Sequence, residues 1–143
     1  MIKRITVWFI ETCLEVLLLG LVLTLLLGHD QHAFLKDVFI YSAGVSLLFF
    51  STGYLLTTVI VRAVWKGRRS WLYPAVATAL YFIHFEIMNV GVRGAFAPAD
   101  RFRIRIIGAF VVLVCTSLGT LALHKWTSGR TESAAVLRNA GNS

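Results

Sequence analysis

Four long apolar runs dominate the sequence and constrain what it can fold into. They cover residues 5–27, 38–61, 71–92 and 104–123, and each has between 20 and 24 residues. A helix needs about 20 predominantly apolar residues to cross a hydrocarbon core of about 30 Å. The runs are apolar nearly all round, whereas a soluble helix of this length keeps a polar stripe. We therefore predict an all-α integral membrane protein in which four spanning helices form an up-down-up-down bundle.

The composition agrees with this prediction. Hydrophobic residues make up 57% of the 143 residues and charged residues 15%, whereas soluble domains average about 45–50% and about 25%. The residues outside the runs are divided between two tails and three short connections, so no soluble catalytic domain fits among them. We predict a single four-span domain over residues 1–126 and a polar, disordered cytoplasmic tail over 127–143. We also expect that the protein is not an enzyme.

Lysine and arginine in the connections predict the orientation. The amino-terminal tail, the second connection and the carboxyl-terminal tail share one side and hold nine of these residues, against five on the other side. Because cytoplasmic loops carry the excess of positive charge, both termini are expected in the cytoplasm. The tryptophans, which favour membrane interfaces, all lie at the ends assigned to the cytoplasm: Trp8, Trp65, Trp71 and Trp126. The small size of the chain, with four predicted spans in 143 residues, suggests a bacterial plasma membrane as the location.

The formal net charge of +7 indicates an anionic partner, and the positions of the basic residues indicate which kind. These residues flank the predicted spans, where they attract anionic lipid headgroups at about 1 kcal/mol each. A nucleic-acid partner would instead require a basic face on a folded surface. We therefore expect membrane lipids, and not nucleic acid, as partners.

Ionisable and polar residues inside the predicted spans are the strongest indication of function. A charge in the membrane interior costs a few kcal/mol, and such residues commonly face the bundle interior or water. With a rise of about 1.5 Å per residue, Glu15 on the first run and His84 on the third are expected at nearly the same depth. The candidate proton- or ion-binding residues are Glu11, Glu15, His84, Glu86 and Asn89.

Two interpretations of these residues are open. Burial disfavours the charged form of a carboxyl, so Glu15 is expected to hold its proton at rest and to exchange it with His84 or bind a cation, as in a proton relay or a cation-coupled transporter. Alternatively, Glu15 hydrogen-bonds a serine or threonine on the second run and holds the bundle or an oligomer together.

A dense basic cluster lies on the side opposite the termini. Its members are Arg93, Arg101, Arg103 and Arg105. Guanidinium groups bind phosphate in a bidentate manner, so the cluster is a candidate site for an anionic lipid or substrate. Alternatively, the arginines extend to the headgroups without a specific ligand.

Metal and cofactor sites have weaker support. His29 and His32, with Asp37 nearby, form a candidate site for a divalent metal. Haem is not expected, because His84 is the single histidine deep in a predicted span. Cys13 and Cys115 form no C-x-x-C pair, so we expect no redox cofactor.

Small residues at helical spacing predict where helices approach closely. On the second run these are Ser42, Ser46, Gly53 and Thr57, and on the fourth they are Gly108, Cys115, Gly119 and Ala122. Small side chains on one face let helix backbones come together in lipid, where burial of apolar surface does not drive association.

Three functional hypotheses follow. The leading one is a non-enzymatic membrane protein, a subunit or accessory protein that self-associates or joins a larger complex. The second is a small transporter or channel that moves protons or cations through Glu15, His84 and Glu86. The third is a small intramembrane enzyme that acts on a lipid with the arginine cluster and His84.

Overall fold

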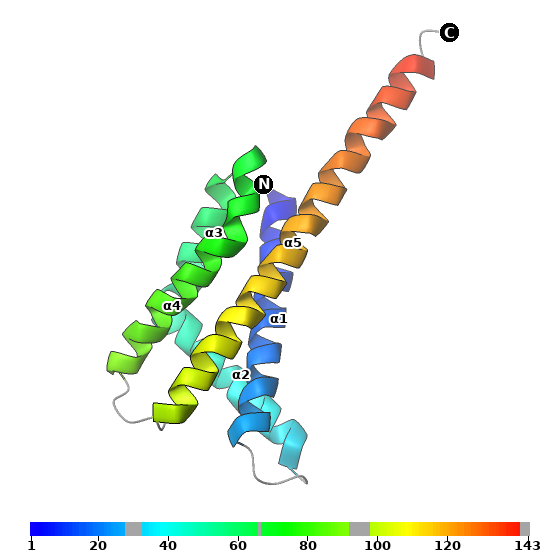
Figure 1. The fold of residues 1–143 in the computed structure, drawn as a ribbon. Coiled ribbons are helices and arrows are strands. Elements are labelled where there is room, and N and C mark those ends of the chain that lie inside the picture. Colours follow the sequence, from blue (N-terminus) through cyan, green and yellow to red (C-terminus); the bar gives the residue numbers. More distant parts are fainter. Residues whose placement is uncertain (28–32, 66, 92–97, 141–143) are drawn as a thin grey trace.

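The computed structural model describes residues 1–27, 33–65, 67–91 and 98–140, with side chains for all of these except 67–68 and 129–140. This part of the chain is helical and contains no strand (Figure 1). Its elements are α1 (Ile2–Leu27), α2 (Phe34–Ser51), α3 (Tyr54–Val64), the 3-10 helix η2 (Gly67–Leu72), α4 (Tyr73–Gly91) and α5 (Pro98–Ala140).

Three of the described helices are long and apolar enough to cross a membrane. They are α1, α2 and the segment Pro98–Ser128 of α5. α4 has 19 residues, a sufficient length, but His84, Glu86 and Asn89 lower its apolar character. α3 is apolar and has only 11 residues.

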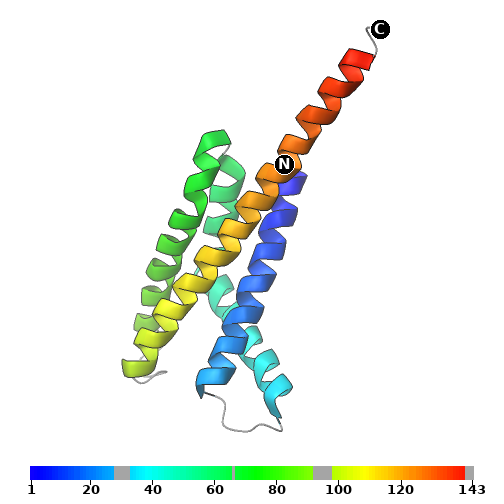
Figure 2. The same ribbon diagram turned by 45° about the vertical axis from the view of Figure 1, so that its right-hand side comes forward.

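The second predicted span, 38–61, is not one helix. α2 ends at Ser51, and Gly53 follows with a φ of 76°, in the left-handed region. Glycine adopts this conformation without the steric cost of a Cβ, which makes it a common residue just after a helix. The backbone N–H of Thr52 donates to the carbonyl of Leu48 at 3.0 Å, which closes the last turn of α2. The run therefore bends between α2 and α3 (Figure 2).

The last helix extends further than the sequence predicted. α5 continues beyond Trp126 to Ala140, into the segment that was expected to be a disordered tail. Alanine and arginine, which recur in this segment, have high helix propensity. Figures 1 and 2 show this part of α5 projecting beyond the other helices.

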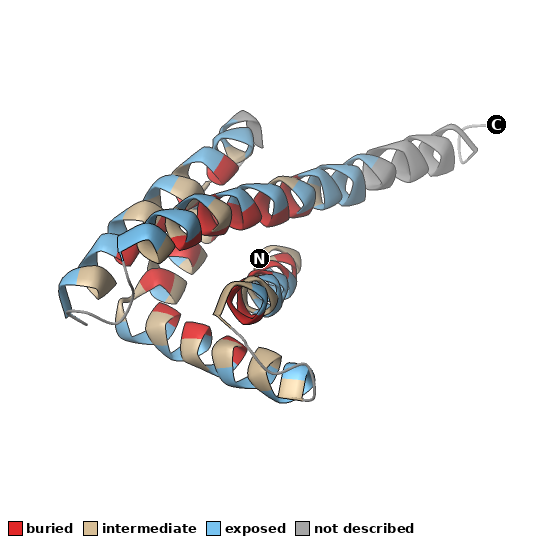
Figure 3. Cartoon of the chain, turned by 60° about the horizontal axis from the view of Figure 1, so that its bottom comes forward, coloured by how far each residue is buried: buried red, intermediate tan, exposed pale blue. Residues whose placement is uncertain are grey.

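Every described helix packs against at least two others. α1 contacts α2, α3 and α5, and α4 contacts α3, α5 and η2. The chain start, η2 and the projecting part of α5 lie at one end of the molecule, which we call the amino-terminal end (Figure 1). Figure 3 shows that buried residues occupy the faces that the helices turn toward one another.

The buried face of α1 has a regular spacing. Val7, Glu11, Glu15, Leu19 and Leu23 recur every four residues and are all buried. Residues four apart lie on the same side of a helix, so this face places two carboxyl groups between apolar side chains in the core. The core itself is built mainly from apolar side chains of α4 and α5, with smaller contributions from α1, α2 and α3.

Glycines mark the closest approaches between helices. A Cβ at Gly20 of α1 would lie 2.9 Å from the backbone nitrogen of Ser42 on α2, and a Cβ at Gly108 of α5 would overlap the ring of Tyr81 on α4. On the fourth run, Gly108, Cys115 and Gly119 of the predicted small-residue face are buried, and Ala122 is exposed. On the second run, Ser42 is buried and Ser46 is exposed. The bend at Gly53 divides that face between two helices.

We predict that Gly20→Ala destabilises the protein by about 1–3 kcal/mol, because the added methyl group forces the backbones of α1 and α2 apart. Gly44→Ala is the matched control, since nothing lies within 4 Å of a Cβ at Gly44. It should be neutral or stabilise the helix by up to about 1 kcal/mol. Unfolding of both variants in mixed micelles checks the prediction, and equal free energies of unfolding would contradict it.

Candidate functional site

The most constrained polar group in the protein is the ion pair between Glu11 and Arg62. Glu11 lies on α1 and Arg62 on α3, and each residue is 3% exposed. Nη2 of Arg62 donates to Oε1 of Glu11. Nη1 of Arg62 donates to Oγ1 of Thr120 on α5 at 3.1 Å. One guanidinium group thus joins three helices.

A fourth helix completes the surroundings of Arg62. The guanidinium carbon lies 3.7 Å from the centre of the Tyr73 ring on α4. A cation over an aromatic face is attracted by the ring, and the attraction grows when water is excluded. The side chain of Arg62 therefore contacts α1, α4 and α5 at once.

The local sequence explains why the pair fits. A Cβ at Gly119 of α5 would overlap the carboxyl group of Glu11, so glycine leaves the space that this group occupies. Oε2 of Glu11 and Nε of Arg62 are buried without a hydrogen-bond partner among the described groups. Each charge is thus neutralised by its partner, while one polar atom on each side chain retains unused bonding capacity.

A second polar group lies one helical turn further along α1. The hydroxyl of Tyr54 donates to Oε2 of Glu15 at 3.3 Å. The Tyr54 ring meets the His84 ring edge-on, with 5.6 Å between their centres. Nδ1 of His84 lies 2.7 Å from the carbonyl oxygen of Leu80, and because a carbonyl oxygen only accepts, this nitrogen carries the proton. Tyr54, which the sequence analysis did not select, therefore contacts both Glu15 and His84.

His84 also lines a small apolar cavity. The cavity has a volume of about 60 Å³ and is bounded by side chains of α1, α2, α4 and α5, including Leu19, Phe49 and Phe85. Its walls are almost entirely hydrocarbon, so it offers few partners to a polar ligand. A site for water needs two to four polar partners.

Glu86 does not join the buried group, and the expectation that it is buried was wrong. Its Oε1 lies 2.9 Å from Nη1 of Arg105, and the two side chains are 48% and 44% exposed. Residues two apart on a helix point in different directions, so Glu86 faces outward where His84 faces inward. Asn89 is half-buried on the same helix.

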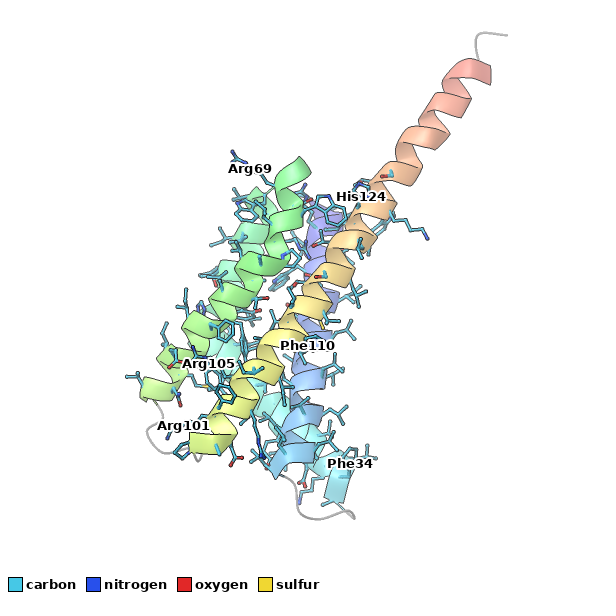
Figure 4. The ribbon with its side chains drawn as sticks, in the orientation of Figure 1. Phe34, Arg69, Arg101, Arg105, Phe110 and His124 are labelled. Atoms are coloured by element: carbon cyan, nitrogen blue, oxygen red, sulfur yellow. The ribbon has the colours of Figure 1, made fainter. Side chains whose placement is uncertain are left out.

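The predicted arginine cluster is described in part. Arg105 pairs with Glu86 and lies 5.2 Å from the centre of the Phe82 ring. Arg103 is exposed and Arg101 is half-buried, and Arg93 lies outside the described residues. Figure 4 shows Arg101 and Arg105 at the opposite end of the molecule from Arg69 and His124. The hypothesis of a lipid-acting enzyme combines His84 with this cluster. In the structure His84 contacts Tyr54, whereas Arg105 contacts Glu86 and Phe82.

The candidate metal site falls largely outside the described part of the chain. His29 and His32 belong to the residues that are not described, and Asp37 is half-buried in the first turn of α2. Within the ranges that the structure describes, no three histidine, cysteine, aspartate or glutamate residues gather as metal ligands would.

Arg62 is one of the basic residues that the orientation prediction counts in the second connection, and the structure gives it a different role. Tyr54, Thr58 and Arg62 are spaced by four residues on α3, and all three are buried. Thr58 accepts a hydrogen bond from Nε1 of Trp8 on α1 at 3.0 Å. In the sequence, the recurrence of a polar side chain at every fourth position of this segment was the signal that could have placed Arg62 in the interior.

Comparisons with known proteins add no family to this description. Neither models of protein families, nor curated proteins, nor solved structures match the chain.

We predict that Arg62→Met destabilises the protein by about 3–5 kcal/mol, because it leaves the Glu11 carboxylate buried without its partner. The double variant Glu11→Leu with Arg62→Met should recover most of this loss, since it removes both charges. Arg105→Met is the matched control and should cost less than about 1 kcal/mol, because its pair with Glu86 is exposed. Unfolding in mixed micelles measures all three. Equal losses for Arg62→Met and Arg105→Met would contradict the prediction.

Proposed function

We propose that the protein is a small non-enzymatic integral membrane protein that acts as a subunit or accessory protein of a membrane assembly. The observation that carries this proposal is the Glu11–Arg62 pair with its contacts to Thr120 and Tyr73. The pair uses its charges to hold helices together, which is the role of a scaffold.

The exposed surface of α2 supports the same proposal. Of the three long apolar helices, α2 buries the smallest share of its residues. Several of its large side chains are turned outward, with Phe39 76%, Leu47 70% and Phe50 77% exposed. Exposed apolar patches of this kind serve as interaction surfaces or meet lipid. Lipid or a partner helix is the cover that such a surface requires.

The proposed topology follows from charge and length. We propose that α1, the α2–α3 pair, α4 and the first part of α5 cross the membrane as a four-helix bundle, with the amino-terminal end in the cytoplasm. Lysine and arginine are more numerous at this end, and cytoplasmic ends carry this excess. A bacterial plasma membrane is the proposed location.

Affinity purification from native membranes in a mild non-ionic detergent tests the proposed function. We expect either a foreign membrane subunit in a fixed ratio or a discrete homo-oligomer. Leu47→Ala and Phe50→Ala should reduce recovery of that partner several-fold, because they remove apolar contact area from α2. The matched controls are Leu118→Ala and Leu121→Ala on α5, whose leucines are 59% and 50% exposed. A monomer without any partner would contradict the proposal.

A second candidate function, proton or cation transport, is favoured by the arrangement of Glu15, Tyr54 and His84. A carboxyl, a phenol and an imidazole that lie in succession are the types of group that pass protons in membrane proteins. Here the hydroxyl of Tyr54 bonds Glu15 and its ring contacts His84.

Proton flux into liposomes that contain the purified protein tests this candidate. If the protein conducts protons, Glu15→Gln should abolish the flux and Tyr54→Phe should reduce it at least ten-fold, because each removes an exchangeable proton from the succession. Glu86→Gln is the control, since Glu86 lies outside this group, and it should retain the flux. Absence of flux from the unaltered protein would remove this candidate and leave the accessory function.

A further inference from the structure

A pocket at the amino-terminal end is separate from the buried groups described so far, apart from two shared residues, Arg62 and Tyr73. It has a volume of about 530 Å³ and lies between α1, α3, η2, α4 and α5. Lys3, Arg4, Arg62, Trp65, Trp71 and His124 are among its lining residues, and we call it the rim pocket. Ligand pockets commonly have volumes of about 300–1,000 Å³, so the rim pocket is large enough for a small molecule or a lipid headgroup.

The charge of the rim pocket is positive. Three permanent cations line it and, among the described residues, no carboxylate does. Arg62 is neutralised by Glu11, whereas neither Lys3 nor Arg4 forms an ion pair with a described carboxylate. Nη1 of Arg4 donates to the carbonyl oxygen of Trp65, and Nζ of Lys3 lies 4.4 Å from the centre of the Trp126 ring. Two positive charges thus share the pocket without a counter-ion among the described side chains.

A buried donor adds a specific feature to this charge. Arg62 is 3% exposed and lines the rim pocket, and its Nε is buried without a hydrogen-bond partner. Arginine recognises phosphate because several of its N–H groups bond the oxygens in one plane. A phosphate oxygen is an acceptor of the kind for which Nε of Arg62 has no partner among the described groups.

The aromatic walls indicate what the phosphate is attached to. Trp65, Trp71 and Tyr73 line the pocket together with Leu123, and the Trp71 ring lies 5.4 Å from the ring of His124. Tryptophan and tyrosine favour the headgroup level of a membrane, because one end of the ring system is apolar and the other is polar. A ligand with a charged phosphate and an apolar remainder fits these surroundings.

We propose that the rim pocket binds the phosphate of an anionic phospholipid headgroup, with Lys3, Arg4 and Arg62 as its cationic contacts. The pocket lies at the end where the predicted orientation places the cytoplasmic leaflet, whose anionic lipids attract basic residues. Lipid binding there joins the membrane surface to the Glu11–Arg62 pair through Arg62, which belongs to both.

Titration of the full-length protein in non-ionic detergent tests this proposal. The probes are dihexanoyl phosphatidylglycerol, dihexanoyl phosphatidylcholine and glycerol 3-phosphate, and calorimetry measures the dissociation constants. We expect the anionic lipid to bind at least five-fold more tightly than the zwitterionic one, with binding that weakens as salt screens the charges. Glycerol 3-phosphate should bind at least ten-fold more weakly than the anionic lipid. Equal binding of glycerol 3-phosphate would support the phosphate contact and overturn the lipid as its source.

Four variants separate the pocket from general surface charge. Lys3→Gln and Arg4→Gln each should weaken binding of the anionic lipid at least five-fold. Lys125→Gln and Arg69→Gln are matched controls, since they remove one charge each at the same end of the molecule from residues that do not line the pocket; they should change binding less than two-fold. Should Arg4→Gln disturb the fold through its contact with Trp65, Lys3→Gln decides alone, with gel filtration and circular dichroism as checks. Equal effects of Lys3→Gln and Lys125→Gln, or equal binding of the two lipids, would overturn the proposal.

Discussion

A charge in an apolar interior must be neutralised close by, and the fold of this protein depends on one such neutralisation. Separating the ion pair of Glu11 and Arg62 would leave an uncompensated charge in the core, which costs several kcal/mol. The pair therefore restricts the positions of α1 and α3 relative to each other. Thr120 and Tyr73 accept further contacts from the same guanidinium group, so the restriction extends to α5 and α4. Hydrophobic contacts between helices lack this directionality, because one apolar face packs on another in many registers.

The other polar groups are arranged around this pair along the helices. The rim pocket lies at the amino-terminal end, and Arg62 connects it to the pair. One turn further along α1, Glu15 meets Tyr54. Beyond it, Leu19 and Leu23 line the apolar cavity, and the buried hydroxyl of Thr24 donates to the carbonyl of Gly20 in its own helix. Among the described residues, the buried carboxyl and guanidinium groups thus lie in the half of the protein nearest the amino-terminal end. This arrangement supports the two proposals made above, an accessory function and a lipid-binding rim pocket.

Much of the architecture was predictable from composition and spacing. Long apolar runs predicted helices, and the spacing of Glu11 and Glu15 predicted one shared face, because an α-helix has the same period whatever surrounds it. The bend at Gly53 was not predicted, since glycine is tolerated inside membrane helices and its left-handed conformation depends on how α2 and α3 pack. The outward direction of Glu86 follows from which side of α4 meets α3 and α5. The spacing of residues along α4 does not show which side of the helix meets its neighbours.

What the sequence by itself determined is therefore the class of the molecule: an all-helical chain, with helices apolar enough for a membrane and with carboxyl groups on the inner face of α1. Apolar composition and helical periodicity are local properties, so they can be recognised in the sequence before it is known which helices pack together. Only the tertiary structure decided that Arg62 pairs with Glu11, that Tyr54 contacts both Glu15 and His84, and that Glu86 turns to Arg105. These contacts join residues up to 51 positions apart along the chain, the separation of Glu11 and Arg62, and such pairs form only when the helices pack together.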